Sequence, residues 1–234
     1  MEDAERAPPR RPRKGLRRFS RLAWVLAAAA AVSLPAAFAL DRAATDALRR
    51  AAPSVRDALA WIGEYGDWVY QMGAGVLLLA FARATRRLRM QRVLLCMILA
   101  SCAGGIASNA IKPLAGRTRP FVDAVPQGFY GPRLHGEWIV AEYRFCSFPS
   151  SHSATWAGFL GVLLFARGGW PLLALLLLPL VPLARVSTRA HHLSDVTAGV
   201  LLGFLLAGLA WHVAYARLRA VALRLVRRGV EAAA

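Results

Sequence analysis

Six apolar runs, separated by clusters of charged residues, constrain this chain more than any other feature of its sequence. The runs are Leu22–Leu40, Trp68–Ala82, Val93–Ile111, Ala154–Ala166, Trp170–Ala184 and Val196–Tyr215. A helix needs about 20 apolar residues to cross the ~30 Å hydrocarbon core of a membrane. We expect the second run to begin near Trp61 and the fourth near Pro149, so that each can span. The sequence therefore predicts an all-α, polytopic membrane bundle of about six transmembrane helices.

The composition excludes two other classes that a strongly basic chain could join. Hydrophobic residues make up 57% of the chain and charged residues 18%, so disorder is excluded over most of its length. The formal net charge of +17 would suit a nucleic-acid binder, but such a protein spreads its charge over a polar surface. Here the charges cluster between apolar runs, so we expect the membrane as the partner and no nucleic acid.

The basic clusters also predict an orientation. They lie in the N-terminal tail, in the loop between the second and third runs, and in the C-terminal tail. By the positive-inside rule, both termini are cytoplasmic and the other loops face the periplasm or the exterior of a bacterial cytoplasmic (inner) membrane. The expected organisation is a basic cytoplasmic tail (residues 1–21), a six-span domain (residues 22–215) and a basic amphipathic cytoplasmic tail (residues 216–234). The segment Asp41–Ala60 has the spacing of an interfacial helix, interrupted at Pro53.

Polar residues gather in three further segments, Lys112–Pro120, Phe148–His152 and Arg185–Asp195. No predicted span separates the first segment from the second, and two spans separate the second from the third. All three segments are therefore expected on one face of the membrane, the outer one.

These segments carry the residue types needed to transfer a phosphoryl group. A histidine with an aspartate four residues later, as in His191 and Asp195, can have one ring nitrogen fixed by the carboxylate while the other attacks. A second histidine, His152, can protonate a leaving oxygen. Permanent cations suited to phosphate oxygens are supplied by Lys112, Arg119 and Arg185. These cations would repel a divalent ion, so we expect a metal-independent site.

The spacing resembles the signature of the type-2 phosphatidic acid phosphatase (PAP2) superfamily, which also includes the vanadium haloperoxidases. Its pattern is Lys-x6-Arg-Pro, then Pro-Ser-Gly-His, then Ser-Arg-x5-His-x3-Asp. The positions that match in order and spacing are Lys112, Arg119, Pro120, Pro149, Ser150, His152, Arg185, His191 and Asp195. The resemblance implies a PAP2/haloperoxidase-like helical core.

The resemblance also implies a role for each matched side chain. His191 would form a phosphohistidine, Asp195 would orient it, and His152 would be the general acid. The phosphoryl oxygens would be held by Lys112, Arg119 and Arg185, with a further hydrogen bond from Ser150. No metal and no organic cofactor is implied.

Two positions depart from the pattern. The family's glycine is Ser151 here, within the phosphate-binding segment, and the serine before the third motif's arginine is Ala184. If the backbone at Ser151 had a positive φ, its side chain would be strained by about 1–3 kcal/mol. Neither departure touches the nucleophile.

The remaining polar residues are interpreted as structural. Solvated interface charges are expected for Arg117, Arg133, Arg144 and Arg189. His192, which lacks an aspartate one turn on, is interpreted as an interface residue, and Asn109 as a helix-packing residue. The long loop of residues 121–148 is either a lid that selects the lipid head group or an aromatic belt at the membrane interface.

The function predicted from these features is an integral membrane phosphatase that hydrolyses a phosphorylated lipid at the outer face. Candidate substrates are undecaprenyl pyrophosphate, phosphatidylglycerol phosphate, phosphatidic acid and the 1-phosphate of lipid A. The alternative is a non-catalytic binder or transporter of phosphorylated lipids, which only Ser151 and Ala184 favour. Six spans argue against a haloperoxidase.

Overall fold

The protein is described by a computed structural model covering residues 14–140, 142–166 and 170–215. The predictions for residues 1–13 and 216–234 lie outside this part of the chain. Its helices are α1 (Lys14–Arg49), α2 (Pro53–Tyr65), α3 (Trp68–Ala84), α4 (Leu88–Ala115), α5 (Ser151–Phe165), α6 (Trp170–Leu177), α7 (Leu180–Ser187) and α8 (Leu193–Leu209), which continues as a π-helix, Ala210–Tyr215. A hairpin of β1 (Arg133–Leu134) and β2 (Glu137–Trp138) and a 3-10 turn (Tyr143–Phe145) lie in the loop between α4 and α5.

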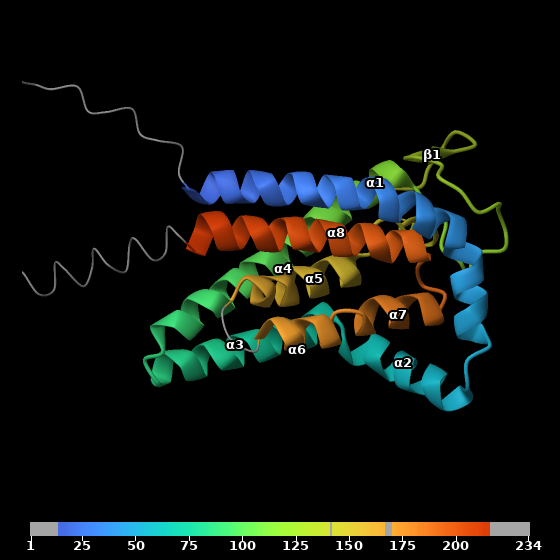
Figure 1. The fold of residues 1–234 in the computed structure, drawn as a ribbon. Coiled ribbons are helices and arrows are strands. Elements are labelled where there is room, and N and C mark those ends of the chain that lie inside the picture. The colour runs from blue at the N-terminus through green and yellow to red at the C-terminus, as the bar shows by residue number, and fades with distance from the viewer. Residues whose placement is uncertain (1–13, 141, 167–169, 216–234) are drawn as a thin grey trace, which may run out of the picture.

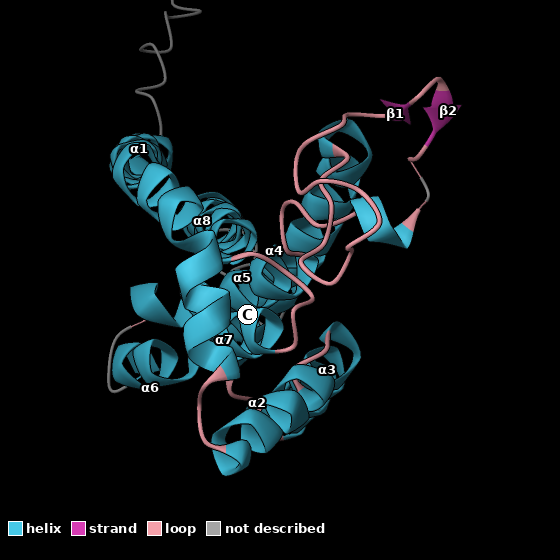
Figure 2. Cartoon of the chain, turned by 90° about the vertical axis from the view of Figure 1, so that its right-hand side faces the viewer, coloured by secondary structure: helices cyan, strands magenta, loops and turns pink. Residues whose placement is uncertain are grey.

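Helix α5 lies at the centre of the bundle, between α4 and α8 (Figure 2). Glycines on these helices let their backbones approach closely. A Cβ atom at Gly104 of α4 would lie 2.7 Å from the Ala154 carbonyl oxygen, and one at Gly203 of α8 would lie 2.6 Å from the same atom. Small residues at such contacts are a common way to pack helices in membranes. The arrangement fixes the first turn of α5 against the second halves of α4 and α8.

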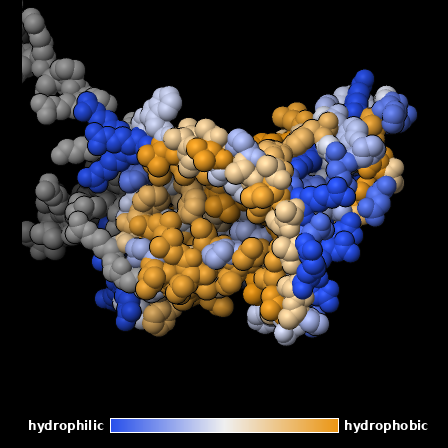
Figure 3. All heavy atoms as spheres, turned by 45° about the vertical axis from the view of Figure 1, so that its right-hand side comes forward, coloured by the Kyte–Doolittle hydropathy of each residue, from blue (hydrophilic) through white to orange (hydrophobic). Residues whose placement is uncertain are grey.

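The face of the bundle seen in Figure 3 is broadly apolar between its two charged ends. Four helical segments are long and apolar enough to cross a membrane, namely Arg17–Arg49, Leu88–Ala115, Trp170–Ser187 and Leu193–Val213, and α3 is a shorter apolar helix. Helix α5, with 15 residues, is also short, but most of its side chains are buried inside the bundle. The prediction of an all-α, multi-pass membrane protein is confirmed, with the count of six as an approximation.

The structure corrects the predicted ends of the first two spans. Helix α1 continues through Asp41 to Arg49, so the first half of the expected interfacial helix belongs to α1. The chain breaks only before Pro53, which takes the first turn of α2, where its missing N–H costs nothing. The second span starts at Trp68 rather than Trp61, because α2 ends at Tyr65 and the chain turns through Gly66 before Asp67 caps the start of α3.

The fifth apolar run forms two short helices, α6 and α7, instead of one. The break falls at Leu178 and Pro179. Figure 1 shows that the loop between α4 and α5 lies at the end of the bundle opposite the first turns of α1. The starts of α5 and α8 and the end of α7 reach this same end, where the three polar segments meet.

Candidate active site

The three polar segments meet through backbone and side-chain hydrogen bonds. The Ser150 N–H donates to the Asp195 carbonyl oxygen at 3.0 Å, which joins the second segment to the third. The Ser147 N–H donates to the carbonyl oxygen of Arg117 at 3.1 Å, which joins the loop before α5 to the first segment. The first and third segments are joined by Arg119, whose guanidinium donates to the Ala190 carbonyl oxygen at 2.9 Å.

A cavity of about 980 Å³ opens beside this junction. Of the predicted site residues, its lining contains Lys112, Arg119, Ser151, His152 and Arg185. The remaining predicted residues, Ser150, His191 and Asp195, are buried and do not line it. The cavity thus brings together the three cations and one of the two histidines, with the second histidine behind its wall.

The cations are held in different ways. Lys112 lies in the last turn of α4, which Gly116 ends in a left-handed conformation while donating its N–H to the Lys112 carbonyl oxygen. Arg119 uses three of its five N–H donors, since it donates to the backbone carbonyls of Tyr143, Ala190 and Cys146. Arg185 lies in the last turn of α7, and its buried Nε has no hydrogen-bond partner among the described residues. The Nε of Arg185 is therefore one donor at the cavity wall that no described residue uses.

Tyr143 covers this group from the long loop. Its ring centroid lies 3.8 Å from the Arg119 guanidinium carbon, a cation–π contact. Phe121, from the same loop, stacks on Tyr143 with their centroids 6.1 Å apart. Val140, Tyr143 and Cys146 all line the cavity, so the long loop forms part of its wall.

His191 is 1% exposed and lies behind the cations. Its Nδ1 is 3.6 Å from Asp195 Oδ2, beyond hydrogen-bond length, and has no other partner among the described residues. The pKa of His191 is lowered to about 3, chiefly by burial and to a smaller extent by the nearby guanidinium groups of Arg119 and Arg185, which together outweigh the opposing effect of the Asp195 carboxylate. The ring is therefore neutral at pH 7, the state in which a histidine can act as a nucleophile.

Asp195 is held by several donors. Its Oδ2 accepts from the Ser147 hydroxyl at 2.6 Å and from the His192 N–H at 2.8 Å. Its Oδ1 accepts from Arg117 Nη1 at 2.6 Å. Donors from three separate positions in the chain thus fix the orientation of the carboxylate, with Oδ2 on the side of His191.

His152, in the first turn of α5, has a partner that the sequence analysis did not identify. Its Nε2 lies 3.3 Å from Oδ2 of Asp67, the residue that precedes α3. Asp67 also lines the cavity. Nothing in the sequence pairs this aspartate with His152, which lies 85 residues further along the chain.

Ser150 and Ser151 occupy the start of α5. Ser150 is the N-cap, and its hydroxyl contacts the Ser153 N–H at 3.4 Å and the Ser153 hydroxyl at 3.1 Å. Ser151 is the first helical residue and does not have a positive φ, so its side chain does not cause the backbone strain that a positive φ would bring. Its hydroxyl donates to Asn109 Oδ1 at 3.0 Å, and both residues line the cavity.

Two interpretations of charged or polar residues as interface groups are wrong. Arg117 is buried, with ion pairs to Asp195 and to Asp41 of α1. His192 is also buried, and its Nε2 lies 3.1 Å from the Thr118 carbonyl oxygen. The signal that could have revealed Arg117 is Asp41, since a carboxylate inside a membrane helix needs a cationic partner. Arg189 is half-buried and donates to the Pro120 carbonyl oxygen at 2.6 Å, whereas Arg133 and Arg144 are exposed as expected.

Comparisons with known proteins agree with this arrangement. The model of the family described as the PAP2 superfamily matches residues 92–219, which contain all three polar segments. The chain is also similar to a solved structure, "the first transmembrane PAP2 type phosphatidylglycerolphosphate phosphatase from Bacillus subtilis", with a TM-score of 0.56 and 23% identity, over 84% of this chain and 94% of that chain. The structural similarity supports a common fold. Because the family match covers more than half of its length, the chain belongs to the PAP2 superfamily.

Proposed function

We propose that the protein is an integral membrane phosphatase that hydrolyses a phosphorylated lipid through a phosphohistidine at His191. The observation that carries the proposal is the cavity in which the three cations and His152 converge, with the neutral His191 and Asp195 directly behind it. Such a group supplies charge for phosphate oxygens, a nucleophile and a proton donor.

The proposed reaction follows from the two histidines. Nδ1 of His191 faces Asp195, so the proton belongs on Nδ1 and the lone pair on Nε2 attacks phosphorus. The bond from phosphorus to the leaving oxygen breaks, and the protonated ring of His152, beside the Asp67 carboxylate, gives that oxygen a proton and becomes neutral. In the second step a water molecule attacks the phosphorus of the phosphohistidine while His152 takes one of its protons. The bond from phosphorus to Nε2 breaks, which releases inorganic phosphate and free His191. Because His191 lies behind the cavity lining, the cationic side chains must shift as the phosphate enters.

The lining of the cavity also favours a lipid. Beside the cations it contains Trp68 of α3 together with Cys102, Gly105 and Ile106 of α4. Ile106 is 72% exposed on the apolar surface of the bundle. A headgroup can therefore sit among the cations while its chain leaves between α3 and α4 into the hydrocarbon. The basic loops support an orientation in which this site faces the periplasm or exterior.

The direct test is an assay of phosphate release by purified protein, with a chelator present. The panel contains phosphatidylglycerol phosphate, phosphatidic acid, undecaprenyl pyrophosphate and the 1-phosphate of lipid A. His191→Gln is the inactive variant, and His135→Asn, in the exposed hairpin turn where Asn tolerates the positive φ, is the control. Release that His191→Gln abolishes and His135→Asn preserves supports the proposal.

The non-catalytic alternative makes the opposite prediction. A binder or transporter would retain phosphorylated lipid but release no phosphate from any member of the panel. Release that stops with chelator and returns with a divalent ion would overturn the metal-independent mechanism.

A further inference from the structure

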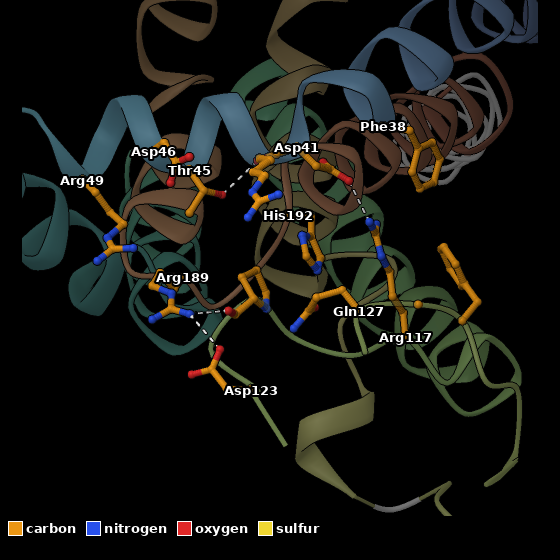
Figure 4. A pocket seen from close by; sticks show the side chains of 14 residues that line it. Phe38, Asp41, Thr45, Asp46, Arg49, Arg117, Asp123, Gln127, Arg189 and His192 are labelled. Carbon is orange, nitrogen blue, oxygen red and sulfur yellow. Dashed lines mark hydrogen bonds and ion pairs between the residues drawn. The ribbon is translucent and has the colours of Figure 1, made fainter. Parts of the chain in front are cut away.

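We propose that Asp41 and Arg117 are positioning residues, which hold Asp195 and leave the cluster of Asp195, Arg117 and Asp41 with one net negative charge on its side of His191. The inference rests on the proposed function and adds Asp41 of α1, which lies outside the three polar segments, together with Arg117 of the first segment. Figure 4 shows Asp41 and Arg117 paired at the wall of a second cavity, whose lining shares no residue with the first.

Arg117 joins both carboxylates. Its Nη1 lies 2.6 Å from Asp195 Oδ1 and its Nη2 lies 2.7 Å from Asp41 Oδ2. The guanidinium is enclosed by two rings, since its carbon lies 4.9 Å from the centroid of Phe38 and 4.8 Å from that of Phe129. A guanidinium buried between two carboxylates and two aromatic faces has little freedom to move.

Asp41 reaches the same helix start from a different direction. Its Oδ1 accepts from the Ser194 N–H at 2.7 Å, and its Oδ2 accepts from the Ser194 hydroxyl at 2.7 Å. Ser194 immediately precedes Asp195 in the first turn of α8. Asp41 therefore holds both the backbone that carries Asp195 and the guanidinium that binds its side chain.

The charges of the three groups explain why Arg117 without Asp41 would not leave a negative charge next to the His191 ring. Arg117 beside Asp195 makes a neutral pair, which would attract the Nδ1 proton of His191 weakly. Asp41 restores one net negative charge to the group. As His191 becomes a phosphohistidine its ring gains positive character, so a negative neighbour is most favourable at that step. Loss of the Asp41 charge should thus slow the reaction more than it weakens substrate binding.

The second cavity provides a matched control. It has a volume of about 700 Å³ and is lined by Asp41 and also by Asp46, one turn further along α1. The Asp46 carboxylate has no hydrogen bond or ion pair within the described ranges of the chain. Asp46→Asn removes the same charge from the same helix and cavity without touching the first turn of α8.

The experiment compares Asp41→Asn, Asp41→Glu and Asp46→Asn as purified proteins. Asp41→Asn keeps an oxygen that can accept from the Ser194 N–H, so it mainly removes charge. We expect it to lower kcat by about 10- to 100-fold, the usual loss for an outer carboxylate that orients a reacting group, with KM changed by less than about twofold. Asp41→Glu should recover part of kcat because it keeps the charge. Asp46→Asn should behave as the unmodified protein.

A second measurement does not depend on turnover. The chain has five histidines, so nitrogen-15 labelling of histidine gives a simple NMR spectrum. We expect His191 to be protonated at Nδ1, and Asp41→Asn to reduce that tautomer while Asp46→Asn leaves it unchanged. An unchanged tautomer together with an unchanged kcat in Asp41→Asn would overturn the inference.

The two proposals fail in different ways. If the unmodified protein releases no phosphate from any lipid, the proposed function fails, and the NMR comparison alone decides the role of Asp41. If phosphate release is normal and depends on His191 but not on Asp41, only the positioning role is wrong. A lower thermal stability of Asp41→Asn with normal kcat would mean that Asp41 has a purely structural role.

Discussion

Gly199 of α8 is the position at which a single methyl group should disturb the candidate site most directly. A Cβ at Gly199 would lie 2.5 Å from the Ser150 carbonyl oxygen and 3.0 Å from the Ser153 Cβ. Both contacts are to the first turn of α5, which carries His152. Neither a backbone carbonyl in a helix cap nor a Cβ can rotate away, so Gly199→Ala must push α5 and α8 apart.

The size of the effect follows from these distances. Carbon–oxygen contact becomes comfortable near 3.5 Å, so the two helix starts must separate by about 1 Å. Overpacking of this kind costs about 1–3 kcal/mol. In a protein of this size each kcal/mol of lost unfolding free energy lowers Tm by about 2–4 °C, so we expect the Tm of Gly199→Ala to be roughly 2–12 °C lower. A displacement of about 1 Å at reacting groups can also reduce turnover about 100-fold.

The assay is thermal unfolding in detergent, together with phosphate release, compared with Gly73→Ala. Gly73 is an exposed glycine of α3 with no heavy atom within 4 Å of an added Cβ, so this variant should lose neither Tm nor activity. The reasoning is refuted if the two variants have the same Tm and the same kcat.

Four further predictions concern the two histidines, the metal and the topology. His152→Ala should lose most activity on a phospholipid but keep measurable activity on an activated aryl phosphate, whose leaving group needs no proton. General acid catalysis contributes ~10²–10⁴-fold to the rate, so the loss of activity on the aryl phosphate should be smaller by up to that factor. Equal loss on both substrates would contradict a role as general acid. The pKa of His191 is about 3 in the folded protein against 6.5 ordinarily, so below pH 6.5 the unfolded chain binds a proton that the folded protein does not. The free energy of unfolding should therefore decrease as the pH is lowered from about 6.5 to 3, by up to ~1.4 kcal/mol per pH unit for this group. In denaturant titrations, His191→Gln should lack this part of the pH dependence. Phosphate release should persist in the presence of a chelator, and dependence on an added divalent ion would count against the mechanism. Cys146, at the cavity wall, should react with an impermeant thiol reagent in intact cells, whereas reaction only after lysis would place the site in the cytoplasm.

The sequence alone was sufficient to predict the helical membrane architecture, because hydropathy and charge can be read locally along the chain. Apolar runs predicted the main helices, and counting the spans between polar segments predicted that the segments meet at one end, as Ser150, Arg119 and their partners show. The ends of helices were harder to predict. Nothing in the sequence between Asp41 and Arg49 stops a helix, so α1 runs on where an interfacial helix was expected.

The sequence did not predict the partners of the site residues, because those partners are distant in the chain. Arg117 and Asp41 are 76 residues apart, and His152 and Asp67 are 85 apart. A charge beside an apolar run is usually solvated, so Arg117 was assigned to the interface. Only the packing of α1 against α8 shows that its guanidinium is enclosed.

The close approach of α4, α5 and α8 also decides where the released phosphate goes. With Gly104 and Gly203 both at the Ala154 carbonyl, these helices have no room even for an added Cβ between their backbones at that level. An inorganic anion cannot pass between them there, so under the proposed function we expect the product to leave by the mouth through which the headgroup entered. With the orientation proposed above, each turnover deposits one phosphate outside the cytoplasm. A cell that reuses this phosphate has to import it by a separate carrier.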